Sequence, residues 1–179
     1  ERARDAHARR EWPVAYHAFT AAANEGELGL EDQIAFGDAC WWMGAVEESI
    51  HAFETAYHRA MAAGDPLRAA YAAQFNAWTV KILREPSQAS GWIRRASRVL
   101  ADLPERAEHG YLAYYEFEIA LERDEVDTAL ETARQVQASG QRFGDPTLHT
   151  LGILAEGRAL IPQGSNRAGG ERDGEEVRG

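Results

Sequence analysis

Apolar and polar residues along the chain recur with the period of amphipathic α-helices, and no stretch alternates as a β-strand does. The Asp-Pro pairs at 65–66 and 145–146 indicate helix starts, because aspartate caps a helix and proline fits its first turn. The stretch REPSQ at 84–88 ends a helix, because a residue that precedes proline is pushed out of the helical region. The pattern predicts helices over 2–10, 12–24, 30–43, 46–63, 66–83, 87–103, 105–122, 126–139 and 146–162.

A triplet of small, large and small residues, spaced four and then three apart, recurs inside the second helix of each predicted pair. Its four copies are Ala15–Phe19–Ala22, Ser49–Phe53–Ala56, Ala89–Ile93–Ala96 and Ala129–Ala133–Val136. The copies begin 34, 40 and 40 residues apart. A repeated helical pair of this length indicates an α-solenoid. We therefore expect an all-α fold over residues 1–164, an α-solenoid of antiparallel helix pairs with about four units and a truncated fifth.

Residues 30–63 resemble the tetratricopeptide repeat (TPR) without gaps. Gly37 and Gly44 fall on the close-packing and turn positions of that motif. The third and fourth units keep the triplet but lose both glycines, and the fifth regains them at Gly157 and Gly164. The resemblance extends over about residues 1–164 and implies a protein-interaction module with a concave groove.

The same resemblance implies that the first helix of each pair lines the groove. The side chains expected to point into it are Asp38, Trp41, Tyr71, Gln74, Trp78, Lys81, Tyr111, Tyr114 and Glu118, followed in the fifth unit by Leu151, Leu154 and Arg158. Helical spacing supports a shared face for Gln74, Trp78 and Lys81. For Trp78 and Tyr114, packing against neighbouring repeats stays open as an alternative. Trp42 lies beside the turn, and we expect it to pack against the next helix.

Residues 165–179 hold a single large apolar residue, Val177, and this composition predicts a disordered tail. The chain begins at Glu1 rather than methionine, which suggests a fragment of a longer protein. Because both terminal units are incomplete, we expect frayed ends or self-association through them.

The chain of 179 residues has a formal net charge of −10, which disfavours nucleic-acid binding through a broad basic surface. No apolar run approaches the length of a membrane span, so we expect no membrane partner and a cytoplasmic location.

Candidate chemistry is sparse. His51, Glu54 and His58 share a predicted helix, but the histidines are seven residues apart, so a solvated helix face is a better interpretation than a metal site. Cys40 takes a buried position of the repeat, and we expect it to be inert. No phosphate loop, nucleophile elbow or kinase signature occurs, so we expect no enzyme activity, no catalytic residue and no cofactor.

The first functional hypothesis is a TPR-type scaffold that binds a peptide or partner protein. The second rests on the stretches GDPLRAA and RFGDPTLHTLGILAEGRALI, which are similar to the helical-repeat regions of bacterial LuxR-type transcription regulators. That resemblance implies a ligand- or partner-sensing region whose DNA-binding domain is missing from this chain. In both cases we expect no direct nucleic-acid binding.

Overall fold

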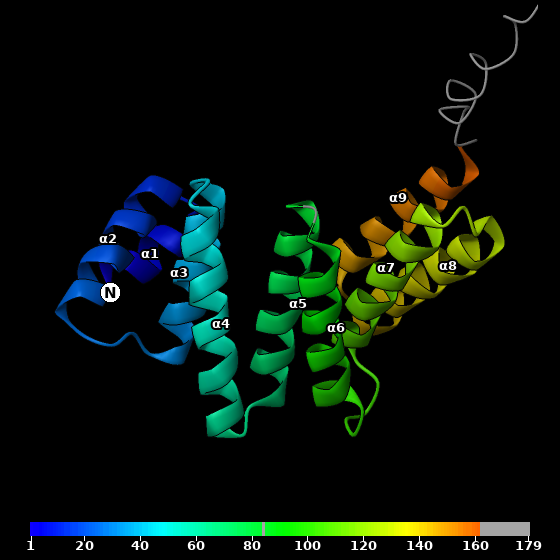
Figure 1. Ribbon diagram of the computed structural model, residues 1–179. Coiled ribbons are helices and arrows are strands. Elements are labelled where there is room, and N and C mark those ends of the chain that lie inside the picture. The colour runs from blue at the N-terminus through cyan, green and yellow to red at the C-terminus, as the bar shows by residue number, and fades with distance from the viewer. Residues whose placement is uncertain (84, 162–179) are drawn as a thin grey trace, which may run out of the picture. The chain divides into compact units, whose positions relative to one another are not determined.

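The computed structural model describes residues 1–83 and 85–161, and every regular element in these ranges is an α-helix. The helices are α1 (Arg2–Ala8), α2 (Trp12–Glu25), α3 (Leu30–Trp42), α4 (Val46–Ala63), α5 (Pro66–Ile82), α6 (Pro86–Leu100), α7 (Ala107–Glu122), α8 (Val126–Phe143) and α9 (Pro146–Leu160) (Figure 1). The expected all-α class is confirmed. The expected disordered tail at 165–179 and the expected glycine Gly164 lie outside the described residues.

Consecutive helices pack on one another as a helical repeat requires. In Figure 1, α3, α4, α5 and α6 lie side by side, and each contacts its neighbour along the chain. The chain divides into two compact units, Glu1–Leu112 and Ala113 onward, with the boundary inside α7. The helical-pair arrangement expected from the recurring triplet is present in the described residues.

The helix ends follow the capping signals. Asp65 Oδ1 accepts a hydrogen bond from Arg68 N at 3.0 Å, and Asp145 Oδ1 accepts one from Leu148 N at 3.0 Å. Gly64 and Gly144 have φ of 67° and 66°, a left-handed conformation that favours glycine and ends α4 and α8. Since Gly144 supplies the stop, α8 continues to Phe143 rather than ending near 139 as the sequence predicted.

The core of the first unit is built around an aromatic ring on α4. Phe53 is fully buried and stacks on Phe75 with ring centroids 4.2 Å apart. A Cβ built on Gly37 would lie 2.7 Å from the Phe53 ring, so only glycine allows this approach. Ser49 Oγ also donates a hydrogen bond to Gly37 O at 2.9 Å. The close-packing role predicted for Gly37 is confirmed.

In the second unit, the close approach falls on glycines other than the one predicted. A Cβ on Gly140 would lie 2.2 Å from His149 N, and one on Gly152 would lie 2.4 Å from Gln137 N. Backbone therefore touches backbone where α8 and α9 cross. Gly157, predicted to be the close-packing glycine, is exposed and has nothing within 4 Å of its Cβ position. That prediction is wrong, because no described second helix covers this side of α9.

No helix in the described part of the chain is both long and apolar enough to cross a membrane.

Candidate partner-binding surface

Side chains from three helices meet at Asp38. Tyr71 Oη, on α5, donates a hydrogen bond to Asp38 Oδ1 at 3.2 Å. His7 Nε2, on α1, lies 3.1 Å from Asp38 Oδ2. The Asp38 side chain is only 19% exposed, whereas the Tyr71 residue is 41% exposed. A largely buried carboxylate thus holds the hydroxyl of an accessible aromatic ring.

The electrostatics of this cluster are governed by burial. Desolvation raises the pKa of Asp38, although the hydrogen bonds from His7 and Tyr71 act in the opposite direction. Desolvation and the neighbouring Asp38 carboxylate also raise the pKa of Tyr71, and the Tyr111 hydroxyl adds to this effect. The Tyr71 hydroxyl therefore stays protonated at neutral pH and acts as a donor.

The predicted residues of α5 continue along the same helix face. Gln74 Nε2 donates a hydrogen bond to Glu108 O at the start of α7, at 2.7 Å. Trp78, Lys81 and Tyr111 are partly buried. We call the face formed by Asp38, Tyr71, Gln74, Trp78 and Lys81 the α3–α5 surface.

The adjacent residues Trp41 and Trp42 differ in exposure and in the rings that they contact. Trp41 is partly buried and packs edge-on against Phe75 of α5, with centroids 5.8 Å apart and an interplanar angle of 89°. Trp42 is 62% exposed and stacks on Trp12, with centroids 5.5 Å apart and an angle of 12°. The ring contact of Trp42 is therefore with the preceding helix α2, whereas the sequence predicted packing against the next helix.

The predicted residues of the second unit form an ion-paired cluster. The guanidinium of Arg158, on α9, binds both carboxylate oxygens of Glu118, on α7, with Arg158 Nη2 3.2 Å from Glu118 Oε2. Arg158 Nη1 also lies 3.5 Å from Tyr114 Oη, and its guanidinium carbon lies 5.4 Å from the centre of the Phe117 ring. Glu118 is buried, and burial is the main cause that raises the pKa of Tyr114 to about 12. Glu118 is therefore covered by Arg158, whose own side chain is 45% exposed.

Cys40 and the histidines of α4 differ in their burial. Cys40 is fully buried, and desolvation raises the pKa of its thiol to about 12, so the nucleophilic thiolate is not formed near neutral pH. His51, Glu54 and His58 are all exposed on α4. Among residues 1–83 and 85–161, no group of three or more His, Cys, Asp or Glu side chains could hold a metal ion.

Comparison with protein-family models, with curated proteins and with solved structures finds no match for this chain. The structure brings Asp38 and Tyr71 together, as the shared register predicts, and it brings Tyr114 and Glu118 together on α7. Sequence reasoning missed His7, because its partner Asp38 is 31 residues away and no motif links the two positions.

Proposed function

We propose that the chain is a protein-interaction module of TPR type that binds a peptide or partner protein on the α3–α5 surface. The observation that supports this most directly is the accessible Tyr71 ring, whose hydroxyl is held by the largely buried Asp38. The proposal assigns no catalytic residue and no cofactor.

The chemistry of the surface suits protein recognition. Aromatic side chains with a polar tip supply a large apolar contact area and one directed hydrogen bond, and they are frequent at binding hot spots. Tyr71 has its tip already fixed by Asp38, and Asp38 is in turn approached by His7. Because the ring is held before a partner arrives, little rotamer freedom is lost on binding.

The proposal can be tested with a defined probe. Random dodecapeptides displayed on phage are selected against the immobilised full chain, and an enriched peptide is synthesised and titrated calorimetrically. We expect Tyr71→Ala to weaken its affinity by about tenfold or more, the loss typical of a hot-spot aromatic. Tyr71→Phe keeps the ring and should cost less than about tenfold, because it removes a single hydrogen bond.

The matched control is Met61→Ala, which removes another exposed apolar side chain, 48% exposed on α4, a helix that contributes no residue to the α3–α5 surface. We expect this variant to bind the peptide as the original chain does. A peptide that binds Tyr71→Ala and the original chain equally, or a selection that enriches no peptide, would contradict the proposal.

A further inference from the structure

Among the described residues, α3, α5 and α7 each have a buried face at positions that correspond to one another at intervals of 40 residues, and the corresponding face of α9 is exposed. The buried members are Gln33, Gly37 and Cys40 in α3, Ala73, Ala77 and Val80 in α5, and Phe117 and Ala120 in α7. In α9 the same register holds Ile153, Gly157 and Leu160, where Ile153 is 49% and Leu160 63% exposed.

The stripe lies opposite the packed face of α9, and Leu154, beside the stripe, is also 58% exposed. Leu148, Gly152, Ala155 and Ala159 are buried on the opposite side of the helix. Ile161, just past the helix end, continues the open stripe and is 65% exposed. The stripe is therefore a candidate interaction site, because contiguous exposed apolar surface marks such sites.

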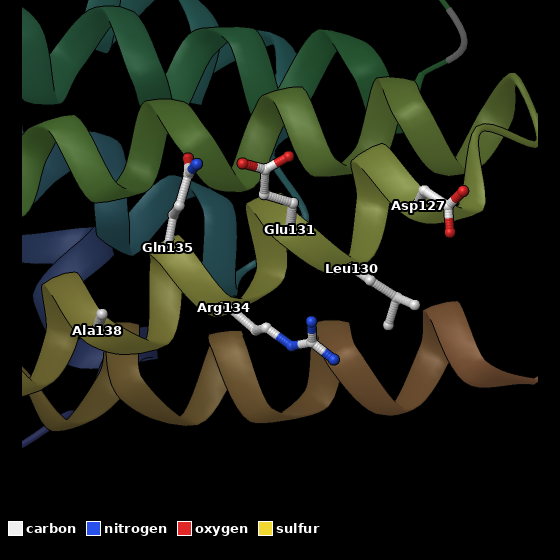
Figure 2. Close-up of a pocket in the computed structure, with 6 residues that line it drawn as sticks. All are labelled: Asp127, Leu130, Glu131, Arg134, Gln135 and Ala138. Atoms are coloured by element: carbon white, nitrogen blue, oxygen red, sulfur yellow. The ribbon is translucent and has the colours of Figure 1, made fainter.

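A hollow on α8 is linked to α9 through Arg134, one of its lining residues. It is lined by Asp127, Leu130, Glu131, Arg134, Gln135 and Ala138, and Figure 2 shows Leu130 and Arg134 on the side of α8 next to α9. Arg134 Nε pairs with Glu156 Oε1 of α9 at 2.9 Å, and this ion pair connects the hollow on α8 to α9. We call the surface formed by this hollow and the stripe Ile153, Gly157, Leu160 and Ile161 the α8–α9 groove.

The charge of the groove is acidic. Asp127 and Glu131 are exposed and lie one turn apart on α8, and neither has an ion-pair partner within residues 1–83 and 85–161. Arg134, the one cation of the hollow, is engaged by Glu156. Basic side chains on an incoming segment would complement this rim.

We propose that the α8–α9 groove binds an amphipathic helix that carries a small–large–small apolar stripe and basic residues beside it. Two observations identify this occupant. The equivalent face of α3, which like α9 has a glycine at this register, is covered by a helix with that stripe, as seen where Phe53 of α4 meets Gly37. The exposed carboxylates of Asp127 and Glu131 favour a helix whose flanking residues are basic. The site is separate from the α3–α5 surface and does not depend on the function proposed for it.

The chain supplies two matched probes. A peptide of residues 86–100 carries the triplet Ala89–Ile93–Ala96 with three arginines and no acidic residue. A peptide of residues 46–63 carries the triplet Ser49–Phe53–Ala56 with three glutamates and one arginine. Each is labelled with fluorescein and titrated with the full chain, and fluorescence anisotropy is measured. We expect saturable binding of the basic peptide and at least about tenfold weaker binding of the acidic one, because only the first complements the rim.

Variants locate the binding. Leu160→Lys and Ile153→Lys each replace an apolar side chain of the open stripe with a charge that repels the arginines of the peptide, and each should weaken binding of the basic peptide by about tenfold or more. The control Met61→Lys makes the same kind of change at an exposed apolar position of α4 and should leave the affinity unchanged. The double variant Asp127→Asn, Glu131→Gln should bind less tightly and show a smaller dependence on salt.

Three results would overturn the proposal. One is the absence of saturable binding of the basic peptide at concentrations up to about 100 μM, the range of weak peptide complexes. Another is that the basic peptide binds the original chain, Leu160→Lys and Ile153→Lys with equal affinity. The third is a dimer in sedimentation velocity that Leu160→Lys converts to monomer, because the groove would then belong to a second copy of the chain.

Discussion

The α3–α4 and α7–α8 pairs fill the same repeat interface with opposite arrangements of size. In the first pair, Gly37 on the first helix receives the ring of Phe53 from the second helix. In the second pair, the equivalent first-helix position is Phe117, and the equivalent second-helix position is Ala133, which lies in the same buried cluster. Both phenylalanines are fully buried, so one ring fills the interface in each case.

The exchange of size between the two helices explains why the α7–α8 pair forms although it lacks a glycine at the position equivalent to Gly37. An interior is packed to high density, and the total volume of facing residues matters more than which helix carries the larger one. A small residue is needed at the first-helix position only where the second helix supplies the large residue. The central residue of the triplet therefore has to match, in size, the first-helix residue that faces it.

Phe117→Ala should be the most damaging single change, because it leaves Ala facing Ala133 across a void. We expect a loss of about 3–5 kcal/mol in the free energy of unfolding, measured by urea denaturation followed by circular dichroism. All five tryptophans precede residue 113, so tryptophan fluorescence does not report on this unit directly.

The double variant Phe117→Ala, Ala133→Phe tests the size exchange itself. It transfers the ring to the second helix, as in the α3–α4 pair, and should recover more than about 1.5 kcal/mol of that loss, within the range of couplings between contacting residues. If the two substitutions instead destabilise additively, positions 117 and 133 do not share one packing volume and the comparison fails.

The limits of sequence reasoning follow from the same interfaces. Asp-Pro caps and left-handed glycines act locally, so the helix starts at Pro66 and Pro146 and the ends of α4 and α8 have visible signals. Gly157 was expected to be buried because it shares the register of Gly37. Register fixes where a residue lies on its helix, but burial also needs an opposing helix, which no motif guarantees.

Contacts between distant segments were harder still to anticipate. The His7–Asp38 contact and the stacking of Trp42 on Trp12 join helices through side chains 31 and 30 residues apart. Tyr71 and Asp38, by contrast, come from successive first helices, and the repeat spacing was enough to place both on one face. The part of the α3–α5 surface that follows the repeat was therefore predictable, and the contribution of α1 was not.

Gly37→Ala should have the next largest effect, because the added methyl would meet a ring that cannot easily retreat. The Phe53 ring lies 2.7 Å from the Cβ position and is backed by Phe75 at 4.2 Å between centroids. We expect a loss of about 1–3 kcal/mol, measured by urea denaturation followed by tryptophan fluorescence.

Gly157→Ala is the matched control, since it makes the same change at the equivalent position of the uncovered helix. With nothing within 4 Å of the Cβ, the substitution should stabilise the chain by about 0.5–1 kcal/mol through helix propensity alone. A destabilised Gly157→Ala variant would mean that this face of α9 is covered in solution, and would remove the contrast with α3.

The smallest expected effect concerns two carboxylates on α3 that are held by different partners. Arg4 donates to Asp32 at 2.6 and 2.7 Å and lowers the pKa of that carboxyl, whereas burial raises the pKa of Asp38. A raised folded-state pKa means that the folded chain holds a proton that the unfolded chain has released. Asp38 therefore costs stability as the pH rises above the ordinary aspartate pKa of 3.8, and Asp32 contributes stability there that is lost as the pH falls below it.

The two isosteric variants should therefore show opposite trends in urea denaturation at a series of pH values. The stability of Asp38→Asn relative to the original chain should increase as the pH rises from 3.8 through the raised pKa of Asp38. The stability of Asp32→Asn relative to the original chain should instead be lower at neutral pH, by a small amount because Arg4 is exposed, and the deficit should shrink on acidification. Parallel trends in the two variants would show that the hydrogen bonds from His7 and Tyr71 lower the pKa of Asp38 more than burial raises it. The carboxylate that accepts from Tyr71 would then stabilise the fold at neutral pH, as the arginine-paired Asp32 does.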